Sequence, residues 1–474
     1  MTTRQFTAFA LVLLMPFGAA LPLTRPLASG IYGLYVTPAL ETTDAAALLL
    51  VLLSITAPRR PARRPIGAAV QLLAALAALG ALSVLHAWVP SLAVASTVRW
   101  ALAAAVCWAL VDADVPIEQL VAVFLAGLAL QSLVAILQVI RQGPLGLPGE
   151  LVPLRDWPGA SIFPLGSGRW LRGYGLTFHP NVLGGFLTVG LILSLPLLGS
   201  RVVQVLSCLM TVALLATFSR SSWIATALIL PPTAVWMWRR DRFARRGFAM
   251  TAVIVVAGLS AAGWTWRESI IARIGIEPPP GMTISAPAAM IRRLKYDDRI
   301  ALSAVALRVI ADHPIVGIGA GNSPLAEQRA GVVPLFPHNV ALMLAAEVGI
   351  AGGLLWIALM GSTAWRLRHS RRTAWLVAGV GAFAALQIIA LLDCYPWSLN
   401  AGRLLTVTVL AIVETAAGQT LNAETQRRRD SQNEIGRTFQ KTKPHAIERS
   451  AVAAAQGECL PAIWPAVRSR SGPH

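Results

Sequence analysis

The chain has few charged residues and few cysteines, and each shortage excludes a class of protein. Only 13% of its 474 residues are charged and 55% are hydrophobic, whereas soluble domains carry about 25% charged residues. The mean hydropathy of +0.63 therefore favours a surface solvated by lipid over a water-soluble globule. No Cys-x-x-Cys pair occurs, so neither a disulfide framework nor a zinc site is indicated. The four cysteines are Cys107, Cys208, Cys394 and Cys459.

Acidic residues are also scarce, with 22 Asp and Glu against 40 Lys and Arg, which gives a formal net charge of +18. In a soluble protein this charge would suggest a nucleic-acid partner. Here the arginines form short clusters between apolar runs that could cross a bilayer, so we expect a lipid bilayer and not nucleic acid as the partner. The clusters are Arg59, Arg60, Arg63 and Arg64; Arg239, Arg240, Arg242, Arg245 and Arg246; and Arg366, Arg368, Arg371 and Arg372.

Apolar runs of the length that a membrane-spanning helix needs recur along the chain. The twelve predicted spans are 7–23, 38–57, 66–86, 93–111, 118–140, 181–198, 202–218, 222–238, 248–264, 339–361, 374–392 and 399–417. The second is weak because Glu41 and Asp44 lie near its start, and the eighth because Pro231 and Pro232 interrupt it. The first could also be a signal peptide. We predict an all-α polytopic membrane protein with a large loop between the ninth and tenth spans.

Basic residues in short loops indicate which side of the membrane is cytoplasmic. With the N-terminus inside, the arginine-rich loops all fall inside: 58–65, 239–246 and 366–373. The opposite short loops, 87–92 and 393–398, contain no Lys or Arg. We therefore expect a bacterial inner (cytoplasmic) membrane protein with cytoplasmic termini. Residues 1–417 would form the transmembrane domain and 418–474 a disordered cytoplasmic tail.

Two segments on the predicted outer side are long, at about 141–180 and 265–338. Within the second, apolar residues recur at three- and four-residue spacing over 297–312, which predicts an amphipathic helix lying on the membrane or on the bundle. These residues are Ile300, Ala304, Leu307 and Ile310.

Four elements on that side carry side chains suited to chemistry. They are Arg169 to Asn181, with Arg172 and His179; the turn Phe218-Ser-Arg220; Tyr296-Asp-Asp-Arg299; and His313 to Asn322, followed by Phe336-Pro-His338-Asn339. Each of these residues could instead have a purely structural role: Arg220 could reach lipid headgroups, Arg299 could be solvated, and the histidines could occupy a turn or a helix cap. The convergence of three arginines and two histidines at one end of an apolar bundle favours a site.

Arginine is permanently charged and bidentate towards phosphate oxygens, so it can stabilise a departing pyrophosphate. Histidine is the usual general base near neutral pH. Together they predict transfer from a lipid pyrophosphate. Two weaker motifs are discounted. Gly317-x-Gly319-x-Gly321 follows no strand and reads as a flexible turn, and Asp112-Ala-Asp114 lies on the cytoplasmic side. We predict no metal and no cofactor.

The pattern resembles the O-antigen ligase-like superfamily of O-antigen ligases, some O-antigen polymerases and bacterial O-oligosaccharyltransferases. The resemblance rests on three motifs: Phe218-Ser-Arg220; Arg299 with the helix ending in His313-Pro-Ile-Val-Gly-Ile-Gly319; and His338-Asn339 with Glu347-Val-Gly-Ile-Ala-Gly352. It implies transfer of a glycan from undecaprenyl pyrophosphate to an acceptor hydroxyl on the periplasmic face without metal. The acceptor could be a glycan, a lipid or a protein.

The resemblance implies roles for Arg220, Arg299 and His338. We expect His338 to activate the acceptor in an inverting reaction, while Arg220 and Arg299 hold the diphosphate and Arg172 assists at the rim. His179 and Asn339 are further candidates. The alternative is a transporter or flippase that moves the lipid-linked glycan, which twelve spans would suit. The two large outer loops and the lack of two visible halves in the sequence count against it. A third class is a scaffold for polysaccharide assembly.

Overall fold

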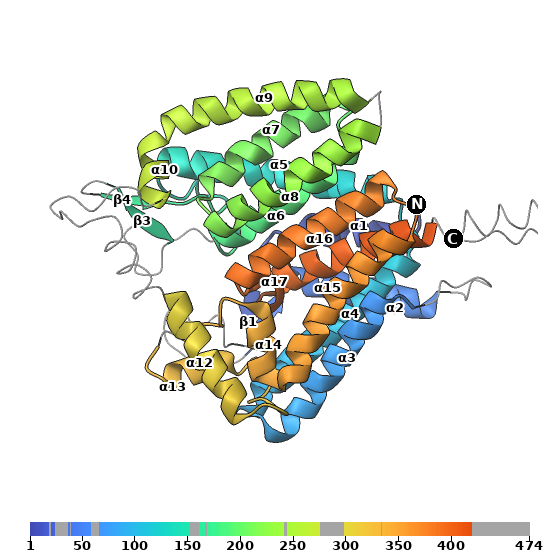
Figure 1. The fold of residues 1–474 in the computed structure, drawn as a ribbon, viewed down its shortest axis with the longest axis vertical. Coiled ribbons are helices and arrows are strands. Elements are labelled where there is room, and N and C mark those ends of the chain that lie inside the picture. The colour runs from blue at the N-terminus through green and yellow to red at the C-terminus, as the bar shows by residue number, and fades with distance from the viewer. Residues whose placement is uncertain are drawn as a thin grey trace, which may run out of the picture. The chain divides into compact units, whose positions relative to one another are not determined.

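The computed structural model is helical through most of the part that it describes, as the sequence predicts for an all-α polytopic membrane protein (Figure 1). Residues Met1–Gly418 form one compact unit. Two short antiparallel strand pairs interrupt the helices: β1 (Ala20–Pro22) with β2 (Ala39–Glu41), and β3 (Ile162–Leu165) with β4 (Gly168–Leu171). The described residues are 1–18, 20–23, 37, 39–57, 66–150, 161–165, 168–240, 244–274, 298–332 and 334–419.

Each predicted apolar run contains a helix. In chain order these are α1 (Thr3–Leu14), α2 (Thr42–Thr56), α3 (Ala68–Ser83), α4 (Pro90–Asp112), α5 (Ile117–Arg141), α6 (Pro180–Ser194), α7 (Arg201–Ala216), α8 (Arg220–Arg240), α9 (Ala244–Thr265), α14 (Val340–Val348) with α15 (Ile350–His369), α16 (Ala374–Leu392) and a terminal helix (Asn400–Gln419). Among the described residues, eight helices are long and apolar enough to cross a membrane: α3, α4, α5, α6, α9, α15, α16 and the terminal helix. Helices α1, α2 and α7 are apolar but shorter.

The tenth predicted span, 339–361, is wrong as a single helix. Helix α14 stops at Val348 and α15 begins at Ile350, with Gly349 between them at a φ of 82°. A side chain at Gly349 would overlap the carbonyl group of Ile315. This region of φ is costly for any residue with a Cβ, so glycine permits both the break and the close approach. The long apolar helix in this region is therefore α15.

The outer segment 265–338 contains three short helices in its described part: α10 (Arg267–Ile274), α12 (Asp298–Asp312) and α13 (Ser323–Arg329). The predicted helix at 297–312 is confirmed from Asp298 onward. Of its predicted apolar residues, Ile310 packs on neighbouring elements, whereas Ile300 is 50% exposed and Leu307 is 56% exposed. The buried side chains of the helix are Leu302, Val305, Ala306 and Val309.

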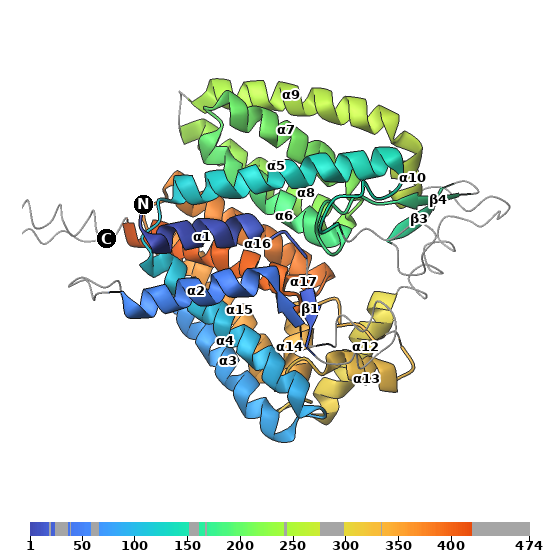
Figure 2. The same cartoon turned by 180° about the vertical axis from the view of Figure 1, so that it is seen from behind.

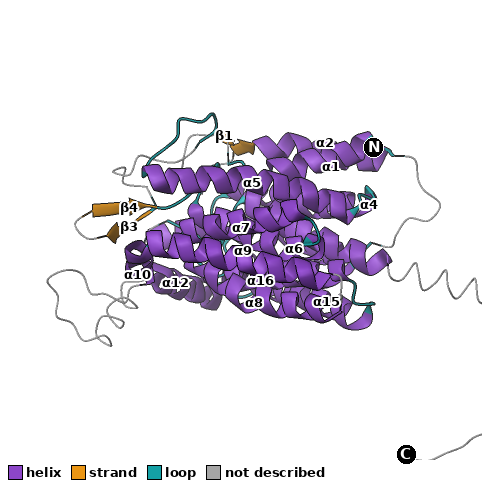
Figure 3. Cartoon of the chain, turned by 90° about the horizontal axis from the view of Figure 1, so that it is seen from above, coloured by secondary structure: helices purple, strands orange, loops and turns teal. Residues whose placement is uncertain are grey.

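Side-chain contacts between helix termini show which ends lie together. Arg4 at the start of α1 pairs with Asp112 at the end of α4 at 2.7 Å, and Arg366 near the end of α15 pairs with Glu414 of the terminal helix at 2.7 Å. The starts of α6, α8 and α14 and the end of α16 lie at the other end of the bundle, towards β3, β4, α10 and α12 (Figures 1 and 3). We call the end with the Arg4–Asp112 and Arg366–Glu414 pairs the inner end, and the opposite end the outer end.

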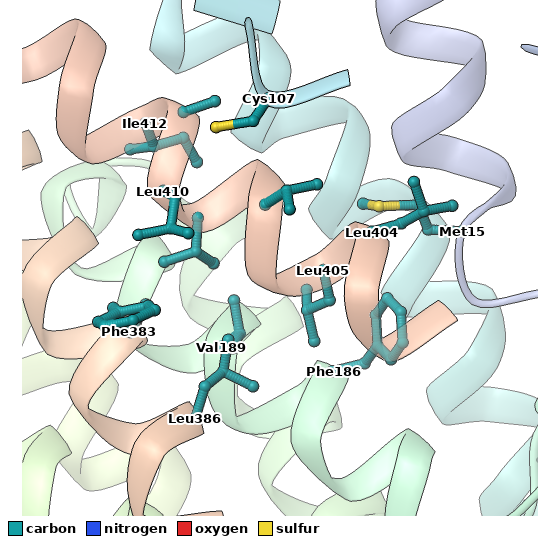
Figure 4. Close-up of a cluster of buried hydrophobic side chains, with 14 of the residues drawn as sticks. Met15, Cys107, Phe186, Val189, Phe383, Leu386, Leu404, Leu405, Leu410 and Ile412 are labelled. Carbon is teal, nitrogen blue, oxygen red and sulfur yellow. The ribbon is translucent and has the colours of Figure 1, made fainter. Parts of the chain in front are cut away.

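The hydrophobic core lies around α6 and the terminal helix. In the apolar stretch of each helix, 83% of the residues are buried in α6 and 89% in the terminal helix, but only 17% in α9. Helix α9 lies at the edge of the bundle, against α7 (Figure 2). Phe186 and Val189 of α6 meet Phe383 and Leu386 of α16 and Leu405 of the terminal helix (Figure 4). The core therefore fixes the positions of α6, α8 and α16, whose outer ends carry the predicted site.

Candidate active site

A chain of polar contacts begins at Arg172, in the segment between β4 and α6. Its Nε donates to the carbonyl oxygen of Thr217 at 2.8 Å, Nη1 donates to Ser161 Oγ at 2.8 Å, and Nη2 donates to Asn181 Oδ1. Arg172 is 4% exposed, so it is buried and does not lie at the rim as we expected. Burial, followed by the charge of Arg273, lowers its pKa to about 9, which still leaves it protonated at neutral pH.

The contacts continue through Asn181 to Asp393, which follows the last residue of α16. Asn181 Nδ2 donates to Asp393 Oδ2 at 2.7 Å, and the backbone N–H of Cys394 donates to Asp393 Oδ1 at 2.9 Å. His338 Nδ1 lies 3.4 Å from the same Oδ1, the separation of an ion pair and long for a hydrogen bond. The amide of Asn181 thus connects the buried guanidinium of Arg172 to the carboxylate that faces His338.

His338 is the predicted base, and the loop before α14 holds it beside Asp393. Its side chain is 19% exposed, so solvent or a substrate can reach the imidazole. The cap of α14 is Asn339, whose side chain accepts a hydrogen bond from the backbone N–H of Leu342 at 3.1 Å. His338 is therefore not needed as a cap, and Asn339 positions it by fixing where the helix begins.

His179, the other candidate histidine, is the N-cap of α6. Its Nδ1 accepts a hydrogen bond from the backbone N–H of Asn181 at 3.1 Å. Burial, followed by the charge of Arg172, lowers the pKa of His179 to about 3, so the imidazole is neutral at physiological pH. With Nδ1 accepting, the ring proton is on Nε2. This geometry gives His179 a structural function in orienting Asn181.

Arg220 is the first residue of α8 and follows a turn with an unusual backbone. Phe218 has a φ of 48°, a region that non-glycine residues rarely adopt, and its fully buried ring packs against Phe163, Trp223 and Trp266. The packed ring holds the turn in place, and Arg220 lies exposed at the outer end as a result. Strained backbone held by packing is frequent at functional sites.

Arg273 of α10 joins the cluster and was not singled out in the sequence. Its Nε donates to the carbonyl oxygen of Phe218 at 3.0 Å. Burial, followed by the charges of Arg220 and Arg299, lowers the pKa of Arg273 to about 10. Arg299, half-buried at the start of α12, also acts on the pKa of Asp393. The predicted arginines Arg172, Arg220 and Arg299 therefore do gather at one end, with Arg273 among them.

Comparison with known proteins identifies the segment that carries most of this cluster. Residues 205–357 match a family model described as O-antigen ligase. The resemblance to the O-antigen ligase-like superfamily is confirmed over that segment, about a third of the chain. A comparison with the curated proteins finds no match.

The O-antigen ligase match indicates an enzyme of the glycan-transferring ligase or polymerase type. The matched segment extends from α7 into α15 and contains Arg220, Arg299 and His338, the residues that the resemblance implied. Arg172 and Asp393 lie outside the match and reach the cluster only through the fold. Of the predicted motifs, Tyr296 and Asp297 lie outside the described residues.

The described residues offer one group of potential metal ligands at this site. Ligand atoms of His338, Asp393 and Cys394 lie within 4.8 Å of one another, and zinc uses these residue types. Both oxygens of Asp393, however, already accept hydrogen bonds from Asn181 and from the backbone of Cys394. Burial also raises the pKa of the Cys394 thiol and so disfavours the thiolate that binds zinc. The geometry thus favours a hydrogen-bonded carboxylate over a metal ligand.

Proposed function

We propose that this protein transfers a glycan from undecaprenyl pyrophosphate to an acceptor hydroxyl on the periplasmic face of the inner membrane, with inversion and without a metal. The observation that carries the proposal is the imidazole of His338 beside the carboxylate of Asp393, among four arginines that include Arg220 and Arg299. The O-antigen ligase match over residues 205–357 supports glycan transfer by an independent route.

In the proposed reaction, Asp393 orients His338 with the Nδ1 proton towards the carboxylate, which leaves Nε2 as the base. The acceptor oxygen attacks the anomeric carbon while its proton moves to Nε2, and the bond from that carbon to the diphosphate oxygen breaks. One displacement without an enzyme-bound sugar inverts the anomeric configuration. A carboxylate that holds the imidazole in one tautomer also stabilises the imidazolium formed when it accepts the proton.

The arginines would stabilise the diphosphate as it departs. Arg220 is exposed and Arg299 is half-buried, so both are accessible for bidentate contact with phosphate oxygens. Arg172 uses Nε, Nη1 and Nη2 in protein contacts, so we infer that it supports Asn181 and raises the local positive potential. Charge that is fixed in place before the reaction stabilises the developing anion without reorganisation.

His338→Ala tests the proposal directly. Transfer should fall at least about a hundredfold because the general base is lost, while the protein stays folded in the membrane. The assay supplies purified protein with a lipid-linked donor and an acceptor, and mass spectrometry measures the new glycosidic bond. A flippase would form no such bond in the wild type. Full activity of His338→Ala would exclude the assigned base, and a wild type that moves the donor without reacting it would exclude the enzyme.

The acceptor class follows from a second measurement. Surface glycans, lipids and glycoproteins are compared by mass spectrometry with and without the gene, and with the His338→Ala gene restored. A glycan that disappears in the deletion and is not restored by His338→Ala identifies the acceptor as a polysaccharide, a lipid or a protein.

A further inference from the structure

The outer surface of α8 carries a groove at the inner end of the helix, opposite the candidate active site. Its volume is about 530 Å³, and its lining residues repeat at three- and four-residue spacing, so they form one face of the helix. They are Pro232, Val235, Trp236, Arg239 and Arg240. The adjoining face, with Thr233 and Met237, is buried, and Trp236 is partly buried against the core. The groove therefore lies at the edge of the bundle, with its other lining residues exposed.

The groove is apolar along one half and cationic at the other. Val235 is 45% exposed and lies with Pro232 on the apolar half. Arg239 and Arg240 are exposed at the end of the helix, and the guanidinium of Arg240 lies 5.2 Å from the ring centre of Trp236. The tryptophan thus joins the apolar half to the cationic half and holds one guanidinium against its face.

A second pair of the same kind lies beside the groove. Arg245, in the first turn of α9, has its guanidinium 5.2 Å from the ring centre of Trp238, and its Nε donates to the carbonyl oxygen of Trp238 at 3.1 Å. Two arginine–tryptophan pairs therefore meet where α8 ends and α9 begins. Tryptophan is enriched where a membrane meets water, which is where a lipid headgroup lies.

This site is separate from the arginine cluster at the outer end. Helix α8 begins at Arg220 and ends at Arg240, which places its two ends about 30 Å apart at 1.5 Å per residue. One helix thus carries two arginine sites, one at each side of the predicted membrane. The substrate diphosphate proposed for Arg220 cannot account for the groove at Arg240.

We propose that the groove binds an anionic phospholipid, with an acyl chain along Pro232, Val235 and Trp236 and the phosphate on Arg239 and Arg240. An open apolar surface beside paired guanidinium groups matches the acyl chain and charged headgroup of a phospholipid, whereas a free phosphate would use the cationic half alone. Arginine binds phosphate oxygens through two parallel hydrogen bonds, and each basic residue near the surface strengthens attraction to anionic lipid.

Native mass spectrometry of the purified protein tests this site. Phosphatidylglycerol and phosphatidylcholine with identical acyl chains are titrated in turn, and the bound fraction of each is measured. The wild type should bind phosphatidylglycerol at least about tenfold more tightly, and Arg239→Gln with Arg240→Gln should remove that preference. Arg371→Gln with Arg372→Gln is the matched control, since both arginines are exposed in the loop between α15 and α16 and the same charge is lost. The control should keep the preference.

Two further measurements separate a lipid from other ligands. Inorganic phosphate at the same concentration should not displace phosphatidylglycerol, and Trp236→Ala should weaken lipid binding because the apolar half is shortened. Equal losses in the two double-arginine variants would mean diffuse attraction and would overturn the proposal. So would complete displacement by inorganic phosphate, or a wild type that binds both lipids equally. All of these substitutions lie far from the outer site, so their effects are distinguishable from loss of transfer.

Discussion

Two opposing effects act on the carboxyl group of Asp393. Burial raises its pKa, whereas His338, Arg299 and His179 lower it by more, so the net pKa lies below the ordinary value of 3.8. The carboxylate therefore stays ionised across the physiological pH range. A group whose pKa is lower in the folded state stabilises that state above its unfolded pKa, and the stabilisation is lost as the pH falls through the folded pKa.

Asp393→Asn should therefore lower thermal stability at neutral pH, and the difference from the wild type should shrink as the pH falls below about 4. A protonated carboxyl group resembles the amide of asparagine, so the two proteins converge in acid. Thermal unfolding in detergent between pH 3 and pH 7 measures the gap. A gap that is constant with pH would mean that the charge of Asp393 does not stabilise the fold.

Arg273 should matter for transfer although no sequence motif marks it. Arg273→Gln removes the hydrogen bond to the carbonyl oxygen of Phe218 and one positive charge near Arg220. We expect the transfer rate to fall about 10- to 100-fold, on the scale of losing one donor that stabilises a developing anion. Arg267→Gln is the control, since Arg267 lies on the same helix with its side chain 53% exposed. Similar transfer rates in the two variants would show that Arg273 does not contribute to transfer.

The sequence indicated those members of the candidate site that carry their own local signal and missed those that do not. Arg220, Arg299 and His338 belong to recognisable motifs within the matched segment. Asp393 is the first residue of the predicted short loop 393–398, and its contact with Asn181 joins residues 212 positions apart. Neither hydropathy nor spacing indicates such a pair, because it arises from how α6 and α16 pack.

At the scale of elements, the break between α14 and α15 sets the geometry around His338. The sequence favoured one span over 339–361 because its residues are continuously apolar, and apolarity does not distinguish one helix from two. The break depends on Gly349 and on the backbone of residues 315–319, which is held by the hydrogen bond from the N–H of Gly319 to the carbonyl of Glu347 at 2.8 Å. That contact is tertiary, so local sequence could not predict it.

Gly349→Ala should destabilise the protein by more than about 1 kcal/mol, because alanine disfavours the left-handed backbone and its methyl group would overlap the carbonyl of Ile315. Transfer should fall too, since α14 begins next to His338. Thermal unfolding and the transfer assay measure both effects. Gly361→Ala in α15 is the control: apart from the helix's own nearby backbone, no atom lies within 4 Å of the added methyl group, and alanine favours a helix. Equal stability of the two variants would contradict the account of the break.

Helix α12 shows a second limit of periodicity. Ile300 and Leu307 have helical spacing, and so have Leu302, Val305 and Val309, which are the residues that pack. A helix with two apolar faces gives no sequence signal for which one faces the protein. The helix itself was predictable from its pattern, whereas its rotation depended on α13 and α14.

At the scale of the whole molecule, the pairing of helix ends agrees with the alternation predicted from the apolar runs. We expect Ile315→Cys, at a side chain 83% exposed near the outer end, to react with a membrane-impermeant maleimide in intact cells. Arg371→Cys should react only after lysis. Both substitutions are made in a variant with the native cysteines replaced by serine, and labelling is measured by mass shift. Labelling of both positions in intact cells would contradict the predicted orientation.

The contact between Asn181 and Asp393 has a consequence for the newly made chain. During synthesis the ribosome makes Arg172, Arg220 and His338 before Asp393, so the nascent polypeptide already holds these cations and an imidazole but lacks the carboxylate that faces His338. The polar contacts that join Arg172 to His338 can therefore be completed only late in synthesis, after α16 has been made.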